Sequence, residues 1–237
     1  MLILVLQPAL NWYNRRCEEA KATQGGILKL ILIRHGETHW NEERRIQGGD
    51  SDIKLNDTGL NQVTKLAAFL KNEPITAIIS SPLQRATATA EAIARHHQLP
   101  VEVDQGLREL RVGELEGISV SNLSITFSQF LMQLWQERGS MELPNGESLV
   151  ELQQRAWRVV ERLLEKHKAN PEHSEKTTVV VVSHYFVTLA IILKALDLPL
   201  PHFTKFKVDN GGVSILEFRD HGALLVTFND TSYQCHS

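Results

Sequence analysis

The chain has 237 residues, of which 42% are hydrophobic and 22% charged, and its formal net charge is −3. This composition is ordinary for a globular protein, and the length suits one large α/β domain. A slightly acidic balance does not favour nucleic-acid binding or attraction to an acidic membrane, so any anion site must be a local cluster of arginine and histidine.

The cysteine and histidine patterns give no sign of a metal centre. Cys17 and Cys235 lie near opposite ends of the chain with no CxxC motif, which argues against a disulfide framework or a zinc site and fits a reducing compartment. The ten histidines include no HExxH motif. We therefore expect a cytoplasmic protein without a metal or another cofactor.

Residues 1–26 form a segment of different character. It opens with the apolar run from Met1 to Leu6, which is too short to span a bilayer, and basic residues and Gly25-Gly26 follow. We expect a poorly ordered extension, or an upstream start that is not the true one; a membrane or partner tether is the alternative. The remainder, 27–237, is predicted to form a single catalytic domain with no membrane association.

Three continuous apolar runs, at 28–33, 75–79 and 178–182, predict strands that are covered on both faces, as in a parallel sheet. Helical patterns separate or follow them. The predicted helices are 57–71 after the cap Asn56, a helix opened by Ser81-Pro82 and running to 96, 148–167, and 185–196. This order predicts a three-layer α/β/α domain with a mostly parallel central sheet and right-handed crossovers.

Three further segments complete the expected domain. Residues 213–218 and 224–228 read as a terminal hairpin. The stretch near 119–140 reads as a helical insertion, and 169–177 as a polar loop.

The three apolar runs end in similar chemistry. The first ends at Arg34-His35, the second leads into Ser80-Ser81-Pro82-Leu83-Gln84-Arg85, and the third ends at Ser183-His184. Carboxyl ends of parallel strands share one edge of a sheet, where ligands bind in α/β folds. The Arg85 side chain should lean back towards that edge, and free N–H groups of its helix should favour an anion there. Guanidinium groups match phosphate oxygens and an imidazole can act as a nucleophile, so the edge is a candidate phosphoryl-transfer centre.

Several motifs in chain order resemble the histidine phosphatase superfamily, also called the phosphoglycerate mutase-like family, over residues 28–228. These motifs are Arg34-His35-Gly36, Trp40-Asn41, Arg45-Ile46-Gln47-Gly48, Leu55-Asn56-Asp57-Thr58-Gly59, Ser80 to Ala86, Leu107-Arg108-Glu109-Leu110, Gly113-Glu114-Leu115-Glu116-Gly117, Pro144-Asn145-Gly146-Glu147-Ser148 and Asp209-Asn210.

The resemblance implies a role for each central residue. His35 would be the nucleophile that forms a phosphohistidine, and Arg34, Arg85 and His184 would hold the phosphoryl oxygens. Glu109 would be the general acid and base, with Glu114 and Glu116 as rivals for that role. Four such side chains supply both positioning and charge, so no metal is required.

The expected partner is a small phosphorylated metabolite, and a homodimer is left open. The residues expected to bind the substrate are Arg34, His35, Gly36, Glu37, Thr38, His39, Trp40, Asn41, Gln47, Gly48, Arg85 and Glu109.

Two departures from the family pattern bear on function. The motifs within residues 107–117 resemble the family's loop that bears the general acid, called the acid loop here. Phosphoglycerate mutases of the family carry Glu-Arg-His-Tyr in this loop, whereas this chain has Glu109-Leu110-Arg111-Val112, which favours a phosphatase over a mutase. The family's His-Gly-Gly is here His184-Tyr185-Phe186, which predicts a narrower or more aromatic pocket unless both rings only pack under the helix. A non-catalytic module that binds a phosphorylated ligand is the third hypothesis.

Overall fold

The computed structural model describes residues 26–123, 143–169 and 177–235. The expected N-terminal extension, up to residue 25, lies outside the described residues, as do 124–140 of the expected insertion and 170–176 of the polar loop. The described start of the insertion, Val120–Leu123, is a 3₁₀ helix.

A six-stranded sheet forms the centre of the domain in the order β3-β2-β4-β1-β5-β6. The first four strands in this order pair in parallel. Strand β5 pairs antiparallel with both β1 and β6. This confirms the mostly parallel sheet and the terminal hairpin. The strands are β1 Leu28–Arg34, β2 Ile75–Ser80, β3 Val101–Val103, β4 Thr177–Ser183, β5 Val213–Arg219 and β6 Gly222–Asp230.

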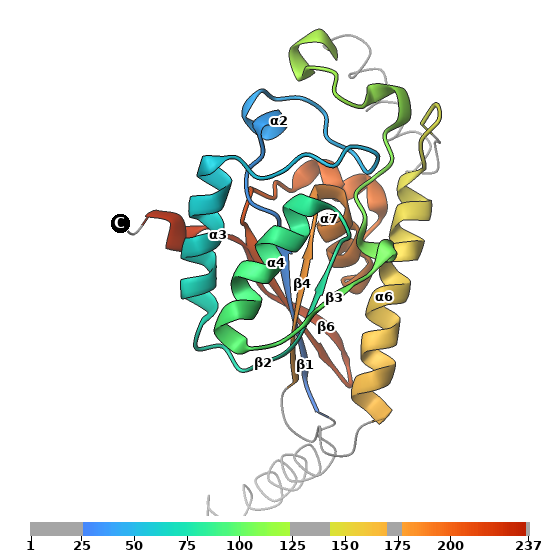
Figure 1. The fold of residues 1–237 in the computed structure, drawn as a ribbon. Helices are drawn as coiled ribbons and strands as arrows, with labels where there is room; N and C mark the ends of the chain where they lie inside the picture. The colour runs from blue at the N-terminus through green and yellow to red at the C-terminus, as the bar shows by residue number, and fades with distance from the viewer. Residues whose placement is uncertain (1–25, 124–142, 170–176, 236–237) are drawn as a thin grey trace, which may run out of the picture.

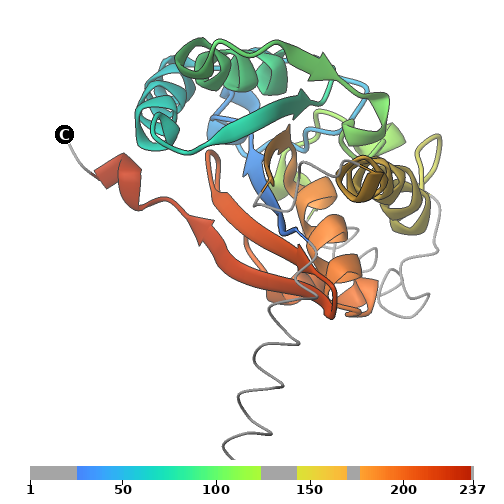
Figure 2. The same cartoon turned by 90° about the horizontal axis from the view of Figure 1, so that it is seen from below.

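Helices cover the sheet on both faces, as Figures 1 and 2 show. Helices α3 (Asp57–Leu70) and α4 (Gln84–His97) pack on one face, and α6 (Leu149–Ala169) and α7 (Tyr185–Ala195) on the other. The continuous apolarity of β1 follows from this arrangement. Leu30 and Leu32 belong to the core under α6 and α7, whereas Ile31 and Ile33 belong to the core under α3 and α4. The three-layer architecture is therefore confirmed.

The strand register aligns the carboxyl ends of β1, β2 and β4, which lead into the predicted site residues. In the β1–β4 pair Arg34 lies opposite Ser183, and in the β2–β4 pair Ser80 lies opposite Val182. The loops that follow β1, β2 and β4 therefore leave the sheet side by side, as the strand-edge argument requires.

The predicted start of the second helix was wrong. Helix α4 begins at Gln84, and its N-cap residue Leu83 makes no side-chain cap. The Ser81 hydroxyl instead lies 2.7 Å from Nε2 of His184, and the Gln84 N–H donates to Oδ1 of Asp52 at 2.7 Å. This N–H group is thus already occupied by a carboxylate, contrary to the expectation that it would be free for an anion.

The short strand β3 was not predicted. It has three residues, and their side chains are exposed or half-buried, so it lacks the continuous apolar run that identified the other strands. Among the helices in the described residues, none is long and apolar enough to cross a membrane.

Candidate active site

His35 follows the last residue of β1 and is almost completely buried, with 3% of its surface exposed. Its backbone N–H donates to the Ser183 carbonyl, and its Nδ1 lies 2.7 Å from the Gly36 carbonyl oxygen. A carbonyl oxygen can only accept, so Nδ1 carries the hydrogen and Nε2 carries the lone pair. Burial, and then the positive charges of Arg85 and Arg34, hold the pKa of His35 well below its usual 6.5. The imidazole is therefore neutral at neutral pH.

Two guanidinium groups flank this histidine. Nη1 of Arg34 donates to the Val208 carbonyl at 2.6 Å. Arg85 lies in the first turn of α4 and is fully buried, and its two Nη atoms donate to the carbonyls of Ser51 and Gly48 at 3.0 and 2.9 Å. Burial lowers the pKa of Arg85 to about 10, so the group stays charged at neutral pH.

His184 stands at the N-cap of α7, directly after β4. Its ring centroid is 5.1 Å from that of His35, in an edge-on arrangement. The ring is fully buried, and burial, with Arg85 as the next cause, holds the pKa of His184 well below 6.5. A second neutral imidazole thus lies beside the first.

Glu109 approaches the pair from the acid loop, with only 4% of its surface exposed. The Ser183 hydroxyl donates to the Leu107 carbonyl and so ties this loop to the end of β4. The Glu109 carboxyl accepts from the N–H groups of Leu110, at 2.8 Å, and Phe186, at 3.3 Å. Burial raises the pKa of Glu109 more than these bonds and the arginines lower it. The carboxyl therefore holds a proton more readily than an exposed glutamate does.

Several buried nitrogens at this centre have no hydrogen-bond partner among the described residues. They are Nε of Arg34, Nε of Arg85, Nδ1 of His184 and Nε2 of Gln47. A buried polar group without a partner costs about 1–3 kcal/mol and is rare in native proteins. Their arrangement around a neutral imidazole fits an anionic ligand that accepts several hydrogen bonds.

A cavity of about 180 Å³ opens onto this cluster. Of the predicted residues, Arg34, His35, Asn41, Gln47 and Glu109 line it. Tyr185 and Phe186 also line it, which confirms the more aromatic pocket and excludes the alternative that both rings only pack under the helix. The Tyr185 ring lies 5.4 Å from the Arg34 guanidinium carbon, within the range of a cation–π contact. Lining residues that we did not predict are Arg45, Ile46, Leu110, Val112, Leu115 and Leu143.

Arg85 and His184 lie near His35 but are not among the residues that line the cavity. The other predicted substrate-binding residues make contacts within the protein. The Gly36 N–H donates to Thr89, and Thr38 caps the one-turn helix α2 (His39–Glu42). The Glu37 carboxylate accepts from Asn56, and the Gly48 carbonyl holds Arg85. His39 is exposed, and the Trp40 ring lies against Gly117. These residues shape the loop around the cavity.

The rival acids have other partners. Glu114 is exposed and accepts from Asn145 at 3.2 Å. Glu116 accepts from the Gly48 N–H at 2.9 Å and from the Ser51 hydroxyl, so it fixes the loop that holds Arg85. Glu109 is therefore the one carboxyl among the three that lines the cavity.

Sequence reasoning also missed Arg155, which lies on α6. Its guanidinium donates to the carbonyls of Gly106, Arg108 and Glu109 and pairs with the Glu147 carboxylate. The sequence feature that could have indicated this ion pair is Glu147 in the Pro144–Ser148 turn, which lies eight residues before Arg155 on an amphipathic helix. Arg155 thus fixes the backbone that carries the Glu109 side chain.

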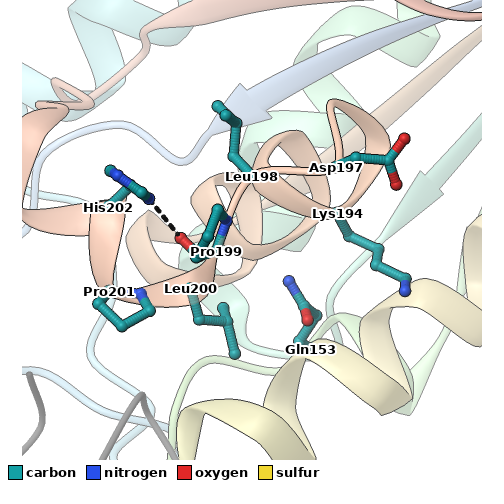
Figure 3. Close-up of a pocket in the computed structure, with 8 residues that line it drawn as sticks. All are labelled: Gln153, Lys194, Asp197, Leu198, Pro199, Leu200, Pro201 and His202. Atoms are coloured by element: carbon teal, nitrogen blue, oxygen red, sulfur yellow. Dashed lines mark hydrogen bonds between the residues drawn. The ribbon is translucent and has the colours of Figure 1, made fainter. Parts of the chain in front are cut away.

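A larger hollow of about 600 Å³ lies where α7 meets the 3₁₀ helix η5 (Leu200–Lys205), at Gln153, Lys194 and the segment 197–202 (Figure 3). Its polar groups include Gln153, which donates to the Ala190 carbonyl, and His202, whose Nδ1 lies 3.1 Å from the Pro199 carbonyl. It contains none of the predicted site residues. Within the described part of the chain, no three metal-ligating side chains of His, Cys, Asp or Glu cluster together.

The fold is that of an α/β protein in which two arginines, two histidines and a glutamate gather at the carboxyl edge of the sheet. The family model of the histidine phosphatase superfamily (branch 1) matches residues 30–231, and the chain belongs to this superfamily. The family prediction is therefore confirmed.

Individual relatives are phosphatases or carry a mutase name. A probable phosphoglycerate mutase GpmB from Proteus mirabilis is 34% identical over 212 residues, which is 87% of this chain and 95% of the relative. A phosphoserine phosphatase from Entamoeba histolytica, solved with 3-phosphoglyceric acid, is 31% identical, with a TM-score of 0.73 and coverage of 87% and 98%. A mycobacterial glucosyl-3-phosphoglycerate phosphatase is 25% identical, with a TM-score of 0.74 and coverage of 86% and 99%. These relatives support an enzyme.

The contacts of Arg155 predict a measurable structural role. Arg155→Lys keeps the charge opposite Glu147, but one ammonium group cannot serve three carbonyls and a carboxylate. We expect a loss of about 1–3 kcal/mol in the free energy of unfolding, measured by urea denaturation. Arg158→Lys, an exposed position on the same helix, should change it by less than about 0.5 kcal/mol. Equal stabilities of the two variants would show that the Arg155 contacts carry no weight.

Proposed function

We propose that the protein is a metal-independent phosphomonoester hydrolase that acts through a phosphohistidine on His35. The observation that carries the proposal is the set of unpartnered buried nitrogens around a neutral imidazole whose lone pair is on Nε2. A phosphate monoester carries close to two negative charges at neutral pH, which Arg34 and Arg85 match. The expected substrate remains a small phosphorylated metabolite.

In the first step, Nε2 of His35 attacks phosphorus and the ester P–O bond breaks. The Arg34 and Arg85 guanidinium groups stabilise the phosphoryl oxygens. We assign the Ser81 hydroxyl as the donor to Nε2 of His184, 2.7 Å away, with the Ser81 oxygen accepting the Leu83 N–H. In that tautomer Nδ1 of His184 is an N–H donor for a phosphoryl oxygen. The departing alkoxide takes the proton of the Glu109 carboxyl.

In the second step, water attacks the phosphohistidine and Glu109 accepts its proton. The P–N bond breaks, inorganic phosphate leaves, and the lone pair returns to Nε2 of His35. Glu109 must be protonated in the first step and ionised in the second, which its raised pKa favours. No step of this cycle needs a metal ion.

A phosphoglycerate mutase-type transfer is the second candidate, supported by the mutase name of relatives such as the Proteus mirabilis protein. Against it, Leu110 and Val112 stand where the mutase motif has polar and aromatic residues, and both line the cavity. The non-catalytic binding module is disfavoured because it gives no reason for a neutral, buried imidazole beside a protonatable carboxyl. The cytoplasmic location and the homodimer stay predictions.

The first test is the covalent intermediate. Brief incubation with ³²P-labelled substrate and an alkaline quench should trap acid-labile phosphate on His35 of the wild type. His35→Ala should lose both label and turnover while its melting temperature stays close to that of the wild type, because the covalent step is gone. His39→Ala, at an exposed histidine nearby, should keep the label. Label on another residue, or activity in His35→Ala, would contradict the mechanism.

The same labelling separates the candidate functions. Labelling should survive extensive EDTA treatment; a loss that Mg²⁺ or Zn²⁺ restores would end the claim of metal independence. In a chase, the label should appear as inorganic phosphate even with excess 3-phosphoglycerate present. Transfer of the label to 3-phosphoglycerate would identify the mutase instead.

A further test concerns Glu109 as the acid. Glu109→Gln cannot transfer a proton, so it should slow phosphorylation by alkyl phosphates about 10²–10⁴-fold and by p-nitrophenyl phosphate far less, since that leaving group is stable as an anion. With alkyl phosphates, the wild-type rate should fall as pH rises through the raised pKa of Glu109, and the variant should lack this limb. Glu114→Gln is the matched control. Equal losses with both leaving groups would refute the assignment.

A further inference from the structure

We infer that the alcohol part of the substrate is apolar and about the size of one ring or a four-carbon chain. This inference rests on the proposed hydrolysis and adds the class of leaving group. It follows from the part of the cavity that the phosphoryl group would not occupy.

Five aliphatic side chains line the same cavity and are called the aliphatic wall here. The acid loop contributes Leu110, Val112 and Leu115, and Ile46 and Leu143 complete the wall. Leu110, Val112 and Leu143 are themselves core residues, and Ile46 and Leu115 pack against the same core under α6 and α7. The wall is therefore held in place by the packing beneath it, with Ile46 and Leu115 as its partly buried members.

Gln47 also lines the cavity, and its unpartnered Nε2 is among the nitrogens assigned above to the phosphoryl oxygens. The other polar side chains near the wall have contacts within the described residues. Arg45 pairs with Glu43 at 2.5 Å and donates to the Gly117 carbonyl at 3.3 Å. The Tyr185 hydroxyl donates to the Phe206 carbonyl at 3.0 Å, and Asn41 accepts from Asn210 at 3.0 Å. A carboxylate or ammonium on the alcohol part would lose water and would have to compete with these contacts for a partner, which is unfavourable. A hydrocarbon group gives up no hydrogen bonds to water when it covers this surface.

The size of the cavity limits the leaving group. The whole cavity, including the part beside Arg34 and His35 that the phosphoryl group would occupy, has a volume of about 180 Å³. An engineered apolar cavity of about 150 Å³ in another protein binds benzene, so one ring is the upper limit for the part that remains. With the phosphoryl oxygens among the buried nitrogens, a benzyl or butyl group would cover the aliphatic wall. Bulkier groups would have to extend into solvent.

The test is a series of ethyl, propyl and butyl phosphates, whose alcohols have similar acidity, with benzyl phosphate, phosphoserine and 3-phosphoglycerate for comparison. We expect kcat/KM to rise about fourfold for each added methylene. Butyl and benzyl phosphate should exceed phosphoserine and 3-phosphoglycerate by at least about tenfold. A flat series, or phosphoserine or 3-phosphoglycerate as the best substrate, would overturn the inference.

A variant ties the effect to the wall. Leu115→Asn should reduce the rise per methylene to about twofold or less, whereas Leu60→Asn, at a 51% exposed leucine on α3, should leave it unchanged. A full slope in Leu115→Asn with normal folding by circular dichroism would overturn the assignment to the wall.

Phosphohistidine trapping with each ester separates the two proposals. Label from every ester with a flat series refutes only the apolar leaving group, and no label from any ester refutes the hydrolysis as well.

Discussion

The site depends on holding the fully buried guanidinium of Arg85 and the half-buried guanidinium of Arg34 beside the His35 imidazole. Like charges repel, and each guanidinium loses its water when buried, so this arrangement is expensive without compensation. The compensation comes from backbone carbonyls of Val208, Ser51 and Gly48, which anchor Arg34 and Arg85. Among the described residues, the Nε of each arginine has no hydrogen-bond partner. Burial, and then these two positive charges, hold the pKa of His35 well below 6.5 and keep the ring neutral.

Much of the surrounding structure serves this constraint. The loop that presents Gly48 and Ser51 is fixed by Glu116 and by Arg108, which donates to the Gly49 carbonyl at 2.6 Å. The acid loop that carries Glu109 is fixed by Arg155, which donates to the backbone carbonyls of Gly106, Arg108 and Glu109. Both loops are therefore attached to the rigid layers of the domain. This explains how residues from distant parts of the chain hold one geometry before a ligand binds.

The fold and the central cluster could be predicted because each had a local signal. Strands covered on both faces read as continuous apolar runs, and a parallel sheet must bring their ends together. The start of α4 was mispredicted because Ser81 resembles an N-cap, whereas its hydroxyl pairs with His184, 103 residues further along the chain. The strand β3 was not predicted because its exposed and half-buried residues do not form an apolar run. Arg155 and the aliphatic wall depend on contacts between loops, and spacing along the chain does not encode them.

The most direct measurement is the protonation of His35 by ¹H–¹⁵N NMR of the imidazole nitrogens, assigned by comparison with the His35→Ala variant. We expect a neutral ring with the hydrogen on Nδ1 that persists at about pH 6, below the usual histidine pKa of 6.5. Such a ring is ready to attack phosphorus through Nε2. An imidazolium at that pH, or a neutral ring with its hydrogen on Nε2, would show that His35 is not the nucleophile in this form.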